Sequence, residues 1–184
     1  DAIAHTGPLF VEEPVAPEFS HLIPSIAAAT SVPIATGERL YSRFDFRECL
    51  EGGIAVAQPD LSHAGGISEC RRIASLAETY GALMAPHCPL GPIALASSLQ
   101  LDFTIPNFLI QECSIGIHYN EGRGILDYVV NTEALDISSG SFELPTRPGL
   151  GIEVDVTELR KAAKAARPWR TPVWRHTDGS LAEW

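Results

Sequence analysis

The 184-residue sequence lacks several features that would assign a protein to a class at once. It has no cluster of Lys and Arg, and its formal net charge is -10. A nucleic-acid or anionic-membrane partner is therefore not expected, because both attract basic patches. No run of 18 apolar residues occurs, which argues against a membrane-spanning helix. The opening residues, DAIAHTGP, do not have the charged start and apolar stretch of a secretion signal.

Cysteine is also scarce, and its spacing is uninformative. The four cysteines show no CxxC pair, so neither a disulfide framework nor a zinc knuckle is expected, and a reducing cytoplasm fits best. Cys88 follows His87 directly, but strand and turn geometry is expected to aim the two side chains apart, so no cysteine nucleophile is assigned.

Apolar runs that alternate with helical periodicity are the main feature that is present. With 45% hydrophobic residues the chain can bury a sizeable core, and one large domain is expected. Strands are predicted at 8–13, 32–36, 54–60, 82–86 and 108–112. Helices are predicted around 19–27, from Pro92 to about 101, and over 65–81 with a buried face of Ile67, Cys70, Ile73, Ala74, Ala77 and Tyr80 closed by Gly81. Such alternation is typical of a parallel sheet buried on both faces.

Two parallel-sheet architectures compete. A doubly wound nucleotide-binding sheet would be expected to carry GxGxxG or a P-loop, and the sequence contains neither. A (β/α)₈ barrel places its chemistry at the C-terminal ends of many strands. Five polar residues stand at the ends of apolar runs, 22 to 27 residues apart, which is about one βα unit: Glu12, Glu38, Asp60, His87 and Glu112. The spacing predicts that they converge at one barrel mouth.

The predicted fold class is accordingly α/β, the C-terminal part of a (β/α)₈ barrel. Residues 1–124 would supply about five βα units with the metal and catalytic residues, and residues 125–184 would form strands, loops and a tail over another surface. Five strands do not close an eight-stranded barrel, and the chain begins at Asp1 without Met. We expect the remaining strands upstream or on a second chain, since the part alone would expose sheet edges and apolar surface.

Glu12 and Glu38 are the candidate metal ligands. Carboxylates at successive strand ends suit Mg²⁺, which prefers oxygen. The alternative is that each is a solvated loop residue or caps the next helix. Glu13 adjoins Glu12, and period-two alternation allows only one of the pair to face the barrel mouth without saying which.

Asp60, His87 and Glu112 are the candidate catalytic residues. A carboxylate one strand away can bond an imidazole, fix its tautomer and raise its basicity for general-base catalysis. Glu112, if buried beside other carboxylates, would have a raised pKa and could donate a hydrogen bond to a developing oxyanion. The alternatives are a histidine packed between Pro86 and Pro89 and a solvated structural glutamate. With the metal, the set suggests proton abstraction next to a metal-bound carboxylate.

The motifs FVEEP, ATGERL, QPDLSHAGGISEC, APHCPLGPIAL and QECSIGIHYN resemble, in order and spacing, the barrel of the mandelate racemase subgroup of the enolase superfamily. Within it the sequence is most similar to sugar-acid dehydratases, on the strength of RFDF, HYN, RPGLG and WRHTDGSLAEW. The resemblance covers essentially the whole chain.

The resemblance implies a role for each residue. Glu12 and Glu38 match two of three Mg²⁺ ligands, and relatives with EQP at this place favour Glu12 over Glu13. His87 matches the base that takes the C2 proton of a sugar acid such as D-galactonate, Asp60 its hydrogen-bonded partner, and Glu112 the group that stabilises the enolate before the 3-hydroxyl leaves. The tail would pack on an N-terminal capping domain, and a homo-oligomer is implied.

The resemblance also implies parts that this chain does not contain. They are the first metal ligand, an Asp, and a second histidine that protonates the leaving hydroxyl, both from an earlier strand, and the capping domain. The chain as it stands is therefore expected to be inactive. Arg39 and His118 are weaker candidates for substrate contacts, against a surface arginine and a loop histidine.

Other functions stay open at this stage. A related acid-sugar dehydratase or a racemase could use the same scaffold, because fold does not fix substrate. A metal-dependent hydrolase barrel is a weaker rival, since the HxH motif it would want is absent. From a different class, the chain could be a non-catalytic fragment, such as a degraded paralogue or half of a split protein.

Overall fold

A computed structural model describes residues 2–115, 124–166 and 173–182. Its centre is a parallel sheet in the order β1-β2-β3-β4, made of β1 (Val11–Glu12), β2 (Ile34–Thr36), β3 (Val56–Ala57) and β4 (Leu83–Met84). A fifth segment continues it by a parallel bridge between Met84 and Phe108. Sequential parallel strands with helical crossovers are the arrangement that the sequence predicts.

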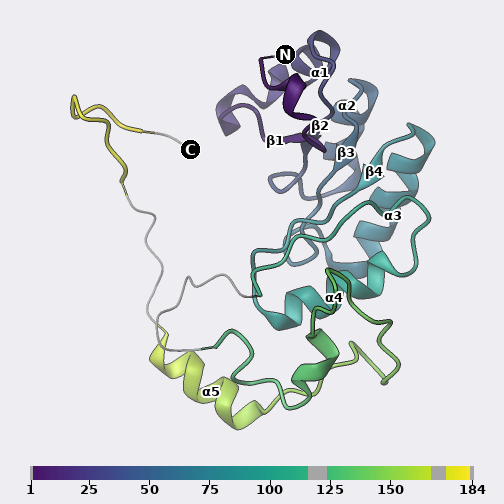
Figure 1. The fold of residues 1–184 in the computed structure, drawn as a ribbon, viewed down its shortest axis with the longest axis vertical. Coiled ribbons are helices and arrows are strands. Elements are labelled where there is room, and N and C mark those ends of the chain that lie inside the picture. The colour runs from purple at the N-terminus through teal and green to yellow at the C-terminus, as the bar shows by residue number, and fades with distance from the viewer. Residues whose placement is uncertain (1, 116–123, 167–172, 183–184) are drawn as a thin grey trace.

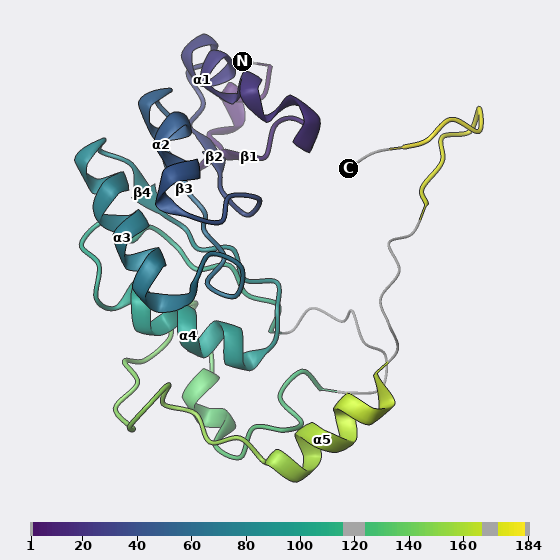
Figure 2. The same cartoon turned by 180° about the vertical axis from the view of Figure 1, so that it is seen from behind.

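Helices follow the strands and lie along one side of the sheet, as the two opposite views agree (Figures 1 and 2). The 3₁₀ helix η1 (Ala4–Thr6) precedes β1, and the crossovers are η2 (Pro17–Leu22) with α1 (Ile23–Ala29), α2 (Arg43–Glu51), α3 (Gly66–Thr79) and α4 (Pro92–Asp102). Proline occupies the first turn of η2, α1 and α4, where its missing N–H has no intrahelical partner to lose.

Strand alternation divides the apolar residues between the two faces of the sheet. Ile34, Ala57 and Met84 join the main core, together with α2 and α3 residues such as Phe46 and Ile73. Their chain neighbours Ala35, Val56 and Ala85 form a second cluster with Phe10 and Leu109. The sheet is therefore apolar on both faces, as near-continuous apolar strands require.

The helix predicted over 65–81 is α3, and its buried face is narrower than predicted. Cys70, Ile73, Ala74 and Ala77 are buried, whereas Ile67 and Tyr80 at its two ends are exposed. Gly81 has φ of 72° just past the helix, the left-handed conformation that favours glycine.

Two of the α-helices in the described residues were not predicted. α2 was missed between the second and third strands, although Phe46, Cys49 and Leu50 are its buried residues at helical spacing. The expectation of strands, loops and a tail over 125–184 is wrong for α5 (Val156–Ala165), which Asp155 caps by accepting from the amides of Thr157 and Glu158. The predicted fifth strand is also reduced, since only Phe108 forms a bridge.

The segment after residue 124 covers α4. The 3₁₀ helix η3 (Thr132–Leu135) buries Leu135 against Leu95 and Leu99 of α4, and Leu126, Phe142 and Leu150 pack around them. Among the described residues, no helix has both the length and the apolar character needed to cross a bilayer.

Candidate active site at the strand ends

The two adjacent glutamates that follow β1 point to different partners. The Glu13 carboxylate accepts from Thr36 Oγ1 at 2.7 Å and from the Gly37 amide at 3.0 Å, so it is tied to the end of β2. Glu12 instead lies within the electrostatic reach of Glu38, His87 and Glu112. Glu13 is therefore bonded to the end of β2, whereas Glu12 stands among the charges of the other strand-end residues, which agrees with the choice that the family resemblance favours.

Gly37 makes the close approach of these strand ends possible. Its φ is 148°, and a Cβ at this position would lie 2.7 Å from the Phe46 ring and 2.8 Å from the carbonyl carbon of Gln58. Only glycine fits against backbone that cannot move aside, so the chain can turn here and present Glu38 directly afterwards.

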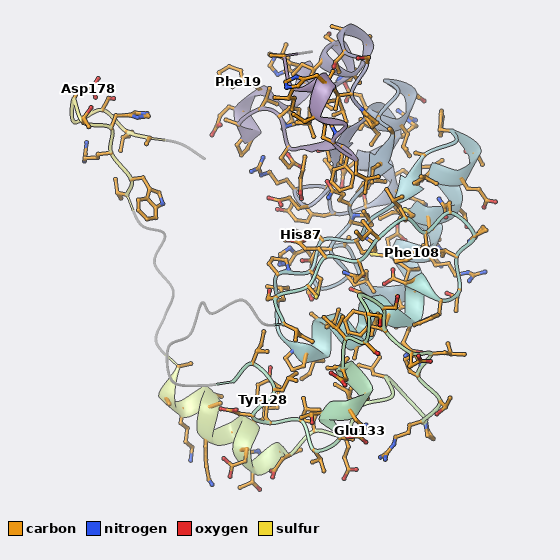
Figure 3. All side chains as sticks on the ribbon, in the orientation of Figure 1. Phe19, His87, Phe108, Tyr128, Glu133 and Asp178 are labelled. Carbon is orange, nitrogen blue, oxygen red and sulfur yellow. The ribbon has the colours of Figure 1, made fainter. Side chains whose placement is uncertain are left out.

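His87 and Asp60 form the closest pair of predicted catalytic residues. His87 Nδ1 lies 2.9 Å from Asp60 Oδ2, and the Ser62 amide donates to Asp60 Oδ1 at 2.6 Å. The Asp60 side chain is 2% exposed and that of His87 15%. In Figure 3 His87 lies on the opposite side of the body from Phe108, the bridge residue of the fifth segment. A carboxylate at Nδ1 orients the ring and directs Nε2 outward.

The second ring nitrogen of His87 faces Glu38, with Nε2 and Glu38 Oε2 3.3 Å apart. Burial by itself would lower the pKa of His87, but the hydrogen bond to Asp60 and the charges of Glu112 and Glu38 outweigh it and raise the pKa above its ordinary value. Burial would likewise raise the pKa of Asp60, and the bonds from His87 and the Ser62 amide more than offset this and lower it. The pair is therefore arranged as a basic imidazole held by an ionised carboxylate.

Glu12 experiences the crowding of negative charge. The residue as a whole is exposed, but partial desolvation of its carboxylate is the largest cause that raises its pKa, followed by the charge of Glu112, while a hydrogen bond from the Gln58 side chain acts in the opposite direction. Carboxylates that repel each other at one place can accommodate a hard cation, which would offset the repulsion.

Glu112 differs from its prediction in one respect. The residue is exposed, so the burial on which its expected protonation depended is not found. Its Oε2 accepts a hydrogen bond from the amide of Cys88 at 2.9 Å. Cys88 directly follows His87 in the chain, so this bond ties the Glu112 carboxylate to the segment that carries His87.

The donor chemistry at the strand ends fits part of a magnesium site. Glu12 and Glu38 supply carboxylate oxygens and no soft ligand, as Mg²⁺ prefers. Within 2–115, 124–166 and 173–182, however, no group of three or more His, Cys, Asp or Glu side chains forms a complete metal-binding cluster. Two carboxylates are thus available to a cation, and further ligands would have to come from water, substrate or other protein oxygens.

Arg39 and His118 were the weaker candidates for contacts with substrate. The Arg39 guanidinium is engaged by carboxylates, with Nη1 2.9 Å from Glu13 Oε2 and Nε 3.4 Å from Glu38 Oε1. His118 lies outside the described residues.

Three residues that contribute to the site were not among the predicted catalytic residues or metal ligands. Glu13, the neighbour that the resemblance does not choose as a metal ligand, makes the bonds to Thr36, Gly37 and Arg39 described above. Gln58 stands two residues before Asp60 and so on the same strand face, a signal that was available. His63 lies with Nδ1 3.7 Å from Asp60 Oδ2, and only the turn after the strand brings it there.

Comparisons with known proteins show which family the chain is similar to. The family described as "Enolase C-terminal domain-like" matches residues 1–159. The D-galactonate dehydratase of Variovorax paradoxus is 56% identical over 184 residues, which are all of this chain and 48% of that protein. The D-galactonate dehydratase of Xanthomonas axonopodis pv. citri is 56% identical over 96% of this chain and 47% of its own length. The chain therefore spans about half the length of these curated relatives.

A solved structure supports the same grouping. The mandelate racemase/muconate lactonizing enzyme from Sulfitobacter sp. superposes with a TM-score of 0.77 at 37% identity, over 87% of this chain and 39% of that one. The strand order and crossovers described above are thus those of a known α/β architecture.

Proposed function

Since the chain belongs to the enolase C-terminal domain-like family, we propose that it carries the base and two metal-ligating carboxylates of a hydro-lyase that converts D-galactonate to 2-dehydro-3-deoxy-D-galactonate. The observation that carries the proposal is the His87–Asp60 pair, whose Nε2 faces the carboxylates at the strand ends. The names of the relatives that are 56% identical support the substrate.

His87 would act as the general base. Its Nε2 takes the proton from C2 of the sugar acid, and the electrons of that C–H bond move into the enolate of the substrate carboxylate. Asp60 keeps Nδ1 engaged and stabilises the imidazolium that forms. Glu112, anchored by the Cys88 amide, would stand beside the enolate oxygens.

Glu12 and Glu38 would hold a divalent cation. When bound, such an ion supplies Lewis-acid stabilisation of the substrate carboxylate. The enolate electrons then expel the 3-hydroxyl, which leaves as water with a proton from the histidine that the family resemblance places on an earlier strand. The enol product ketonises to the 2-keto acid.

The test uses the complete natural protein with Mg²⁺ and a panel of sugar acids. The 2-keto-3-deoxy product is expected with D-galactonate, and His87→Asn should lower kcat by about 10² to 10⁴, the usual contribution of a general base. Exchange of the C2 hydrogen with D₂O should be lost in the same variant. His21→Asn, a change at an exposed residue of η2, serves as the control and should leave both unchanged.

A racemase or a related acid-sugar dehydratase is the second candidate, and the name of the Sulfitobacter relative favours it. C2 exchange and epimerisation without dehydration would contradict the hydro-lyase assignment and retain the base. Full activity of His87→Asn would contradict both, and a complete protein without activity on any sugar acid would favour a non-catalytic chain.

A further inference from the structure

Glu13 is held in an unusual conformation. Its φ is 42°, and within the described residues only one other non-glycine residue, Ser139, has a positive φ. Left-handed backbone is unfavourable for a residue with a Cβ, and it persists where surrounding contacts impose it. The contacts are those of its carboxylate, whose side chain is 11% exposed and which receives Thr36 Oγ1, the Gly37 amide and Arg39 Nη1.

Arg39 stands between two carboxylates and favours one of them. Its Nη1 is 2.9 Å from Glu13 Oε2, within hydrogen-bond distance, whereas its Nε is 3.4 Å from Glu38 Oε1. A guanidinium forms its strongest pairs with two short parallel bonds to one carboxylate. Arg39 therefore contacts both carboxylates and forms no such two-bond pair with Glu38.

Glu38 makes only one contact with Arg39, at 3.4 Å, because the shorter bond of that guanidinium goes to Glu13. The other oxygen of Glu38, Oε2, lies 3.3 Å from His87 Nε2. An arginine seated fully on Glu38 would place a permanent positive charge on the carboxylate that a cation needs, and it would repel that cation.

We propose that Glu13 is a positioning residue that limits the Arg39 guanidinium to a single longer contact with Glu38, and so keeps a two-bond arginine pair from covering the carboxylate that a divalent cation would use. The inference rests on the proposed function for the presence of the cation. Arg39 then has a role other than contact with substrate. The strained backbone of Glu13 is then explained by the need to place its carboxylate against Arg39.

The test measures binding of Mn²⁺ alone to the complete protein, by titration calorimetry or by the electron paramagnetic resonance of free Mn²⁺, so that catalysis is not the readout. Glu13→Gln keeps an oxygen for Thr36 and Gly37 but loses the charge that holds Arg39. We expect Mn²⁺ affinity to fall about 10-fold or more, as is typical when a residue behind a metal ligand is removed.

A substitution of Arg39 tests whether the released arginine is the cause of the loss in Mn²⁺ affinity. If Arg39 blocks Glu38 once it is released, Glu13→Gln/Arg39→Gln should recover Mn²⁺ affinity to within about threefold of the natural protein, and Arg39→Gln alone should not lower it by more than that. A structural role of Glu13 would not be rescued by removing a second residue. Absence of rescue, or an unchanged affinity in Glu13→Gln, overturns the proposal.

A matched ion pair outside the site provides the control. Arg43 Nη1 and Glu69 Oε2 are 2.8 Å apart, and the Arg43 amide also donates to the Glu69 carboxylate. Glu69→Gln removes a comparable charge between neighbouring elements and should leave Mn²⁺ affinity unchanged.

Glu12→Gln tests the metal site separately from the role of Glu13. It should abolish a direct ligand and cost far more affinity than Glu13→Gln; equal losses would contradict the choice of Glu12. If Mn²⁺ binding depends on Glu12 and the rescue occurs, but no sugar acid is dehydrated, the proposed function fails while the role of Glu13 stands. If Mn²⁺ binding does not depend on Glu12, the metal site and the role of Glu13 both fail.

Discussion

At the scale of single residues, Asp102 is a buried carboxyl that the proposed chemistry does not use. It ends α4 and is 7% exposed, and among the described residues neither of its carboxylate oxygens has a hydrogen-bond partner. Burial raises its pKa to about 8. An uncompensated buried charge is unfavourable, so the folded protein retains the proton at neutral pH.

This shift predicts how stability depends on pH. Between the ordinary aspartate pKa and about 8 the folded state holds one proton more than the unfolded state, so the free energy of unfolding should fall as pH rises through that window. The slope from one group is at most about 1.4 kcal/mol per pH unit, and it vanishes above pH 8. Asp102→Asn should remove this contribution. Relative to the natural protein, the urea midpoint of the variant should therefore be more favourable at pH 8.5 than at pH 5.

The exposed Asp136 provides the control, because Asp136→Asn changes the same chemical group without burial. If Asp102→Asn and the natural protein keep the same difference between pH 5 and pH 8.5, the carboxyl has a partner at neutral pH and the prediction is wrong.

The candidate site was largely predictable from spacing, because one polar residue per βα unit places side chains at neighbouring strand ends. The structure brings His87, Asp60 and Glu38 together in this way. It does not place Glu112 in a buried setting, since exposure depends on what covers a residue and not on its position in a strand. The bonds of Glu13 could not be predicted either, because they depend on the direction of a turn.

At the scale of elements, α5 depends on local interactions. None of its residues is buried, so tertiary packing contributes little and the Asp155 cap is important. Asp155→Ala should cost about 1 kcal/mol, which corresponds to about fivefold faster amide hydrogen exchange in residues 156–165. Exchange in α3, which has a buried face, should not change.

Asparagine caps helices about as well as aspartate, so Asp155→Asn is the matched variant and should retain most of the protection. Equal exchange rates in the alanine variant and the natural protein would show that contacts other than the cap hold α5.

The helices that were predicted and those that were missed differ in the strength of their pattern. α3 is long, and its four buried residues repeat at helical spacing, so its existence followed from the sequence. α2 has nine residues and only three buried side chains, a signal that is easily hidden between two strands. α5 buries none, so no apolar stripe marks it, and only the capping aspartate indicates where it starts.

At the scale of the whole molecule, the sheet presents apolar side chains where it ends. Leu9 precedes β1 and is 55% exposed, and Ile110 in the fifth segment is 47% exposed. Exposed strand edges with apolar side chains favour association. The 184-residue chain produced alone should therefore self-associate in a concentration-dependent way, as measured by sedimentation velocity, whereas the complete protein should form a defined species. A monomeric chain that unfolds cooperatively by itself would contradict this.

The sequence by itself determined the alternation of strands and helices, the parallel sheet and the five residues at the strand ends. These follow from local periodicity and from the length of a βα unit, which neighbouring residues encode. Only the tertiary structure decided that Glu13 is bonded to the end of β2, that Arg39 is bound by Glu13, and that Asp102 is buried with no hydrogen-bond partner among the described residues. Each of these depends on which side chains from distant segments meet in space, and chain spacing does not contain that information.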